Sequence, residues 1–157
     1  LNAGVAFCKA GGTIDFTTST TEYDLAHGEY SAAQALAYCL KNNVQPTKLT
    51  MSSDGHASLP IFDDNFNLLG LEVGKESTLH SSFVEAVQEY GVSVEHALMA
   101  ITSNPADVLG INKGRVTINA DADLVLLDNA SLQPIECWSN GVHMVHQAKA
   151  IVKDTFE

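Results

Sequence analysis

Basic side chains are scarce in this sequence. Lysine and arginine together number 8, against 19 aspartates and glutamates, and the formal net charge is −11 at pH 7. Proteins that bind nucleic acid or an anionic membrane need a basic patch to neutralise phosphate groups, and here the few cations are scattered. Nucleic acid and membrane are therefore excluded as expected partners, and the acidity is interpreted as an aid to solubility.

Cysteine is scarce too, and long apolar runs are missing. The three cysteines lie far apart and form no Cys-x-x-Cys pair, so neither a disulfide framework nor a zinc knuckle is expected. No apolar run approaches the length of a membrane span, and no signal peptide is recognisable. These absences favour a cytoplasmic protein with reduced thiols. The sequence begins without methionine, which suggests a piece of a longer protein.

Strands and helices alternate over the first part of the chain. Helices are expected over residues 3–10, 29–43, 76–91, 93–102 and 104–110, strands over 13–19 and 48–53, and a turn-rich loop over 63–70. Ser93 and Asn104 are expected to cap the helices that follow them. After Gly110 the pattern becomes that of strands joined by turns. This order predicts βα units of a parallel α/β fold with a small separate sheet.

The stretch "LTMSSDGHASLP", residues 49–60, joins a strand to an acidic turn. Asp54 would lie directly after the strand, where α/β folds place their catalytic groups. A carboxylate there can bind a metal ion or accept a proton, and Gly55 allows a sharp turn. Asp-Gly after two serines is also ordinary turn chemistry, so the tetrapeptide alone leaves a purely structural role open.

Two distant segments extend this pattern. Residues 11–19 read "GGTIDFTTS", and residues 101–128 read "ITSNPADVLGINKGRVTINADADLVLLD". With "SSDG" they resemble the amidohydrolase superfamily, in which a Thr-x-Asn-Pro-Ala … Leu-Gly … Lys-Gly … Ala-Asp-Leu-Val pattern closes a (β/α)₈ TIM barrel and re-enters a β-sandwich. "PIFDDNFNL" and the closing "VKDTFE" narrow the resemblance to the isoaspartyl (β-aspartyl) dipeptidases.

The resemblance implies a fold and a division of the chain. The fold class is α/β, the C-terminal part of a (β/α)₈ TIM-barrel metal-dependent hydrolase followed by strands of a small β-sandwich. Residues 1–112 would supply the last two barrel strands with their helices, and residues 113–157 the sandwich strands.

The resemblance also implies an activity and a site. Asp54 matches an aspartate that ligates metal and exchanges the proton of a hydroxide held by two zinc ions, so it would act as metal ligand and as general acid and base. The reaction would be hydrolysis of β-aspartyl dipeptides. Ser58 matches a serine that contacts the dipeptide, and Gly55 and His56 are assigned to the same substrate-binding turn. His56-Ala57 replace an Asn-Gly of the dipeptidases, which affects substrate preference rather than chemistry.

The other metal ligands of such a centre are missing. A dinuclear amidohydrolase needs a His-x-His pair, a bridging carboxylate and two further histidines, and this sequence has no His-x-His. His143 and His146 have a metal-like spacing but are interpreted as solvent-facing residues of the terminal sheet. The chain alone is therefore expected to hold no dinuclear zinc site and to be inactive. The missing ligands would come from the remainder of the same barrel, upstream of Leu1, in a homo-oligomer that binds a dipeptide.

Two other interpretations stay open. One is a different amidohydrolase, either dihydroorotase-like or an N-acyl-amino-acid hydrolase, which would share the barrel and the aspartate but differ in its substrate loops. The other is a non-catalytic, self-associating fragment, because part of a barrel exposes unpaired strand edges and an apolar face.

Overall fold

The computed structural model of the chain describes residues 1–152, which form two compact units. The first unit is Leu1–Pro105, and the second begins at Ala106. The predicted boundary between a barrel segment and a sandwich segment, at residues 112 and 113, stays a prediction. The two units differ in their internal packing, which does not identify either of them as barrel or sandwich. Among residues 1–152, no helix combines the length and the apolarity that crossing a membrane requires.

The first unit is built on two parallel strands. β1 (Ile14–Thr17) follows α1 (Asn2–Lys9), and β2 (Leu49–Ser52) follows α2 (Glu22–Ala26), α3 (Ala32–Lys41) and the short 3₁₀ helix η1 (Pro46–Lys48). The register pairs Ile14 with Leu49 and Thr17 with Ser52. Parallel strands joined through a helix are the repeating unit of a (β/α)₈ barrel. The two predicted strands and the helix at α3 are confirmed, whereas α2 was not predicted.

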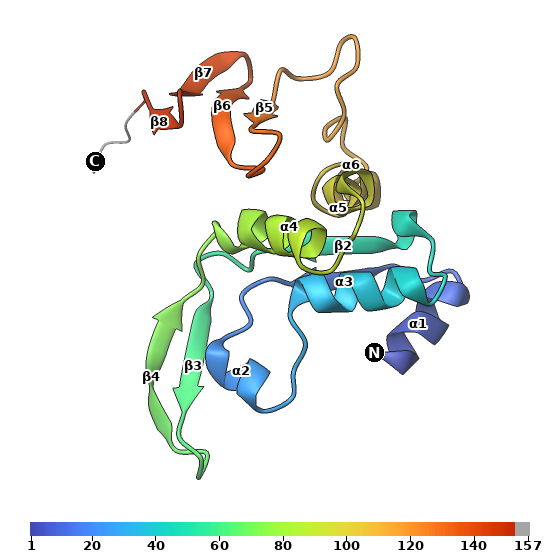
Figure 1. Cartoon of the computed structure of the whole chain (residues 1–157), viewed down its shortest axis with the longest axis vertical. Coiled ribbons are helices and arrows are strands. Elements are labelled where there is room, and N and C mark those ends of the chain that lie inside the picture. Colours follow the sequence, from blue (N-terminus) through green and yellow to red (C-terminus); the bar gives the residue numbers. More distant parts are fainter. Residues whose placement is uncertain (153–157) are drawn as a thin grey trace. The chain divides into compact units, whose positions relative to one another are not determined.

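Three helices pack around the parallel strand pair. α3, α4 (Thr78–Gln88) and α5 (Val94–Ile101) lie beside the strand pair in Figure 1. Leu36, Leu49 and Phe83 are fully buried among them, which makes this the hydrophobic core of the unit. The Ser93 hydroxyl accepts a hydrogen bond from the His96 backbone N–H, so the predicted cap of α5 is confirmed.

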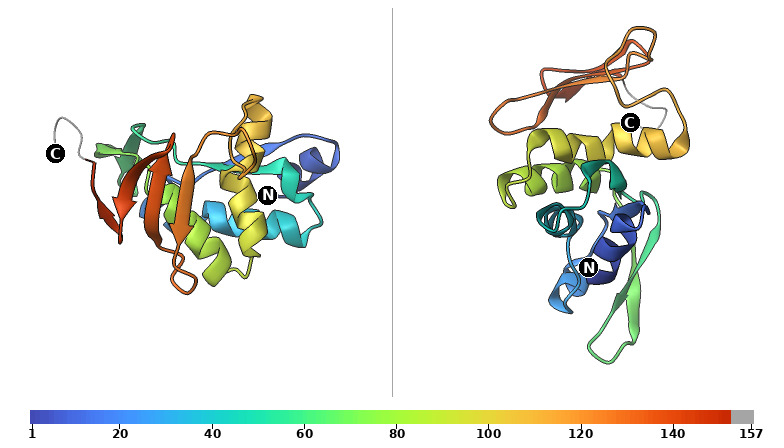
Figure 2. Two further views of the ribbon diagram at one scale, coloured as in Figure 1. Left: turned by 90° about the horizontal axis from the view of Figure 1, so that it is seen from above. Right: turned by 90° about the vertical axis from the view of Figure 1, so that its right-hand side faces the viewer.

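A hairpin projects from the first unit in Figures 1 and 2. β3 (Ser58–Phe62) and β4 (Leu68–Val73) are antiparallel, and Ser58 pairs with Val73. The loop predicted over residues 63–70 is therefore correct only for its first half. The Asp63 carboxylate accepts hydrogen bonds from the Asn67 side chain and the backbone N–H of Asn65, and these bonds lower the pKa of Asp63. The turn-forming residues around Asp63 favoured a loop prediction for the whole segment, so the strands on either side of the turn were not predicted.

Asn104 lies inside a helix instead of capping one. α6 is Ser103–Leu109, and Asn104 is its second residue. Its side chain is 1% exposed, and its amide nitrogen donates to the backbone carbonyls of Pro46 and Leu49, both at 2.8 Å. The capping prediction is wrong because the amide is used in a tertiary contact that fixes the start of β2.

The second unit is an antiparallel sheet of four strands in the order β5-β6-β7-β8 (Figure 2). The strands are β5 (Leu124–Leu127), β6 (Pro134–Ser139), β7 (Val142–His146) and β8 (Lys149–Ala150). The prediction of strands after Gly110 is confirmed for these segments but not for residues 113–123, which are irregular chain with bends and one short turn. Most of the closing motif "VKDTFE" lies outside the described residues.

Candidate active site at the end of strand β2

The two parallel strands bring small polar residues to one edge. Beyond the paired residues, the Thr18 backbone N–H donates to the Ser52 carbonyl at 2.8 Å, and the Ser19 hydroxyl donates to the Ser53 carbonyl. Thr18 and Ser19 are both buried. Asp54 is the next residue along the chain, so its backbone is held by the end of the neighbouring strand, as expected for a site at the C-terminal ends of barrel strands.

Asp54 has an unusual backbone and an open side chain. Its φ is 50°, in the left-handed region, which aspartate tolerates better than most residues. Its carbonyl accepts a hydrogen bond from the Ala57 N–H at 3.1 Å, which closes a tight turn. The side chain is exposed, and within residues 1–152 its carboxylate accepts no hydrogen bond. The carboxylate is therefore held in place by the backbone while its oxygens stay available.

Gly74 allows the hairpin to return against this turn. Its N–H donates to the Ala57 carbonyl, and its carbonyl accepts from the His56 N–H, both at 2.9 Å. A Cβ at position 74 would lie 2.6 Å from the Asp54 carbonyl oxygen, closer than atoms can approach. The absence of a side chain at Gly74 is therefore a condition for the backbone position of Asp54.

The two residues after Asp54 complete the turn. Gly55 donates its N–H to the Ser53 hydroxyl at 3.2 Å and lies under the Glu76 side chain. His56 has φ 65° and is exposed, and its Nε2 lies 3.1 Å from Glu76 Oε1. Both side chains are mostly in solvent, so this contact contributes little stability. His56 is thus a surface loop residue that a ligand above the turn could contact.

Ser58 is the first residue of β3 and is exposed. It follows the turn directly, so its hydroxyl belongs to the same short segment as Asp54. Sequence reasoning therefore grouped residues that are indeed consecutive parts of one turn. It missed Ser19 and Gly74, which hold that turn from other elements, and Glu76, which contacts it at the surface. Only the Gly in "LEVGKES" offered a signal for one of them.

The chain's own residues supply at most part of a metal centre here. The Asp54 carboxylate is an oxygen ligand of the kind that zinc accepts. Among the residues that the structure describes, however, Asp54 belongs to no group of three histidine, cysteine or carboxylate side chains. The donor set at the end of β2 fits one ligand of a metal site and does not fit a complete two-zinc centre.

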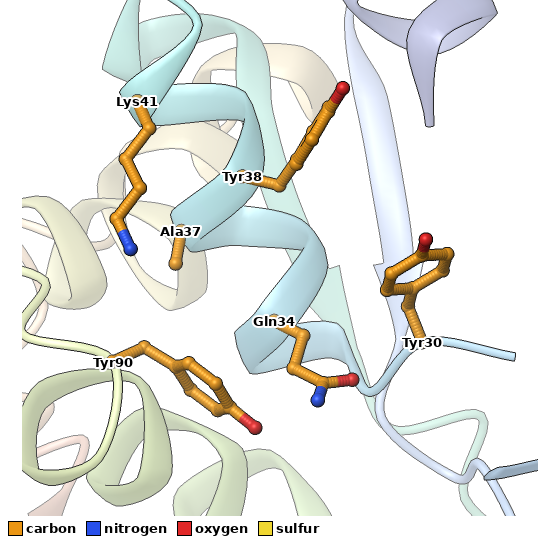
Figure 3. Close-up of a pocket in the computed structure, with 6 residues that line it drawn as sticks. All are labelled: Tyr30, Gln34, Ala37, Tyr38, Lys41 and Tyr90. Carbon is orange, nitrogen blue, oxygen red and sulfur yellow. The ribbon is translucent and has the colours of Figure 1, made fainter.

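A shallow pocket on the helical side is a poor alternative site. It has a volume of about 190 Å³, and Figure 3 shows its lining, which comes mainly from α3 and Tyr90. Ligand pockets usually have volumes of about 300–1,000 Å³. Its lining includes none of the turn residues 54–58 and holds a single cation, Lys41. It offers no arrangement of catalytic groups.

The family of the chain follows from comparison with known proteins. The model of the amidohydrolase family matches residues 29–156, most of the sequence, so the chain belongs to the amidohydrolase family. Its α/β architecture corresponds to part of a TIM-barrel hydrolase with additional sheet strands, which confirms the predicted fold class.

Solved structures give a more specific resemblance. The chain is similar to the β-aspartyl dipeptidase of Fervidobacterium islandicum AW-1 in complex with the β-Asp-Leu dipeptide, with a TM-score of 0.81 and 31% identity, covering 98% of this chain and 39% of that one. A second structure of that organism's β-aspartyl dipeptidase gives a TM-score of 0.76 and 25% identity, covering 98% of this chain and 36% of that one. The predicted resemblance to this group is confirmed.

One curated relative is a dihydroorotase. A dihydroorotase of Clostridium botulinum (strain Eklund 17B / Type B) is 43% identical over 56 residues, which cover 36% of this chain and 14% of the relative. The chain thus spans well under half the length of each of these relatives.

Proposed function

We propose that this chain is the portion of a metal-dependent hydrolase that carries Asp54, and that the complete protein hydrolyses β-aspartyl dipeptides. The observation that supports this most is the open Asp54 carboxylate at the C-terminal end of a parallel strand. The structural similarity over 98% of this chain to the β-aspartyl dipeptidase of Fervidobacterium islandicum AW-1 supports the choice of substrate. The assignment of Asp54 itself is part of the proposal.

Asp54 has two roles in this proposal. It is a metal ligand, and it is the group that receives a proton from the attacking water and returns it to the leaving amine. Bound divalent metal, which we propose to be two zinc ions, would acidify that water and polarise the scissile carbonyl. The carboxylate suits the proton transfer because no donor among residues 1–152 competes for its oxygens.

The substrate-binding part of the turn is Gly55, His56 and Ser58. Gly55 lets the chain turn directly after the carboxylate, and the space that a side chain there would take is occupied by the Glu76 side chain. His56 and Ser58 present an imidazole and a hydroxyl to solvent, and these groups can hydrogen-bond the polar ends of a dipeptide. The Glu76 carboxylate paired with His56 would tune that contact.

The remaining metal ligands belong, in this proposal, to the rest of the barrel. Two parallel strands are present in the described residues, and a (β/α)₈ barrel has eight. The chain alone is then inactive, and we propose that the complete enzyme is a cytoplasmic homo-oligomer. Cys8, Cys39 and Cys137 are free thiols, which suits a reducing compartment.

A dihydroorotase-like activity is the second candidate, because the dihydroorotase relative has the higher identity over its matched segment. An N-acyl-amino-acid hydrolase would share the same aspartate. Substrate comparison separates these three, because each cleaves a different amide next to the same metal centre.

The test measures hydrolysis of β-Asp-Leu by the complete protein, with zinc and after chelation. Asp54→Asn removes the proton acceptor while keeping the shape, and it should lower kcat by about 10²–10⁴-fold. Asp64→Asn is the matched control, since Asp64 is an exposed aspartate in the hairpin turn. Turnover of dihydroorotate instead of β-Asp-Leu would transfer the assignment to the second candidate. Turnover that survives both Asp54→Asn and chelation would overturn the proposal.

A further inference from the structure

We propose that Glu136, His143 and His146 form a second metal site, which binds one divalent transition-metal ion on the four-stranded sheet. One carboxylate oxygen of Glu136 and one ring nitrogen of each histidine lie within 4.8 Å of one another. All three residues come from β6 and β7 in the second unit, so the site does not use Asp54 or the turn that follows it. The proposal is independent of the dipeptidase assignment.

A β-bulge puts the two histidines on one face of the sheet. Along a regular strand, residues three apart point to opposite faces. In β7, however, His143 pairs with Trp138 while Val145 pairs with Cys137, so Met144 is an extra residue. The bulge offsets the alternation by one, and His146 returns to the face of His143. The bulge itself was not predicted, because it cannot be recognised from the spacing of the residues.

The three side chains already converge. His143 Nε2 lies 2.6 Å from Glu136 Oε2, and His146 Nδ1 lies 3.1 Å from Oε1 and 3.2 Å from Oε2. Glu136 is 17% exposed, His143 35% and His146 53%, so both histidines reach solvent, as predicted, while their ring nitrogens also contact the more buried carboxylate. A small displacement of the side chains would allow all three donor atoms to contact one ion.

Neighbouring groups hold this arrangement. The Gln147 backbone N–H donates to Glu136 Oε1 at 3.1 Å. The Trp138 indole stacks on the His143 ring, with centroids 4.7 Å apart and an angle of 10° between the planes. Contacts of this kind orient metal ligands and commonly change affinity by about 10–100-fold.

The donor set indicates the class of ion. Two imidazole nitrogens and one carboxylate suit Zn²⁺, Co²⁺, Ni²⁺ or Cu²⁺ and are poor ligands for Mg²⁺ or Ca²⁺. Three protein ligands leave a coordination position for water or another ligand. In the absence of metal, the histidines contact the Glu136 carboxylate through their ring nitrogens, so binding of the ion must displace protons.

The site contains its own reporter, because Trp138 is the single tryptophan of the chain. The experiment titrates the metal-free 157-residue chain with Co²⁺ and follows Trp138 fluorescence. One Co²⁺ per chain should quench the emission, Zn²⁺ should displace Co²⁺ and restore it, and Mg²⁺ should do neither.

Variants assign the ligands. His143→Gln and His146→Gln should each weaken Co²⁺ binding by at least about tenfold, by analogy with the cost of losing supporting contacts. His96→Gln, at a histidine of α5, is the control and should bind Co²⁺ as the unaltered chain does. His146→Gln is decisive, because His146 does not stack on Trp138 and its loss leaves the reporter's ring contact intact.

Two results would overturn the proposal. One is a chain that is folded by circular dichroism but whose Trp138 fluorescence does not change when Co²⁺ is added. The other is His146→Gln quenched at the same Co²⁺ concentration as the unaltered chain. Neither result bears on β-Asp-Leu hydrolysis, so failure of this site and failure of the proposed function can be told apart.

Discussion

Asp54 and Glu136 are two carboxylates in opposite situations. Asp54 follows a parallel strand, is exposed, and accepts no hydrogen bond from residues 1–152. Glu136 lies within an antiparallel sheet and accepts contacts from Gln147 and two histidines. The difference shows how strand topology sets what a site needs. Two adjacent antiparallel strands, β6 and β7, bring three possible metal ligands together within a short segment of chain. A site at the end of a parallel strand instead needs residues from the other strands of a barrel.

The largest expected effect comes from moving the Asp54 carboxylate. Asp54→Glu lengthens the side chain by one methylene, and a displacement of about 1 Å at a catalytic group can cost about 10²-fold in rate. The loss should appear in kcat/KM of the complete protein on β-Asp-Leu. Glu136→Gln, the equivalent test at the other carboxylate, should leave kcat/KM unchanged. Equal losses in the two variants would remove the contrast between the sites.

A buried amide supports the Asp54 strand from the other side. Asn104→Ala removes two hydrogen bonds to the backbone around η1 and β2 and leaves buried carbonyls without a donor, so it should lower the free energy of unfolding by about 2–4 kcal/mol. Chemical denaturation measures this loss. Asn112→Ala, at an exposed asparagine, should change it by less than about 0.5 kcal/mol. A similar value for both variants would contradict the role of Asn104.

Acid should affect the Glu136 site through its protonation. The backbone N–H of Gln147, and then His143 and His146, lower the pKa of Glu136 below its ordinary value of 4.5. The unfolded chain therefore binds the proton more readily, so the stabilisation is present above pH 4.5 and is lost as the pH falls through the folded-state pKa. In Glu136→Gln the sheet should be weaker near neutrality and depend less on pH below 4.5. The emission wavelength of Trp138 follows the transition, and an unchanged acid profile would refute the assignment.

The smallest effect is expected at His56. His56→Asn keeps a residue that tolerates positive φ and removes the exposed contact with Glu76, so the free energy of unfolding should change by less than about 0.5 kcal/mol. If His56 contacts substrate, KM should change while kcat is retained. Glu76→Gln breaks the same pair without altering the imidazole and separates the two causes. A large stability loss would show that the turn depends on the ion pair.

Local signals in the sequence predicted local structure well. Ser93 caps α5 because a cap needs only the residues that follow it. The strand before Asp54 and the helices beside it were recognisable from periodicity. Residues that act at long range were not. Asparagine is a common helix-capping residue, but Asn104 instead donates hydrogen bonds to carbonyls more than fifty residues earlier in the chain. The Glu136 cluster depends on the bulge at Met144, which spacing rules treat as a regular strand.

Gly74 carries a consequence for how this chain can vary. A library randomised at position 74 and selected for folded protein should return glycine almost exclusively, because any side chain would meet the Asp54 carbonyl. Position 70, in the strand β4 that ends just before Gly74, has no atom within 4 Å of the place a Cβ would take, and it should accept many residues. Two glycines four residues apart would thus evolve at very different rates.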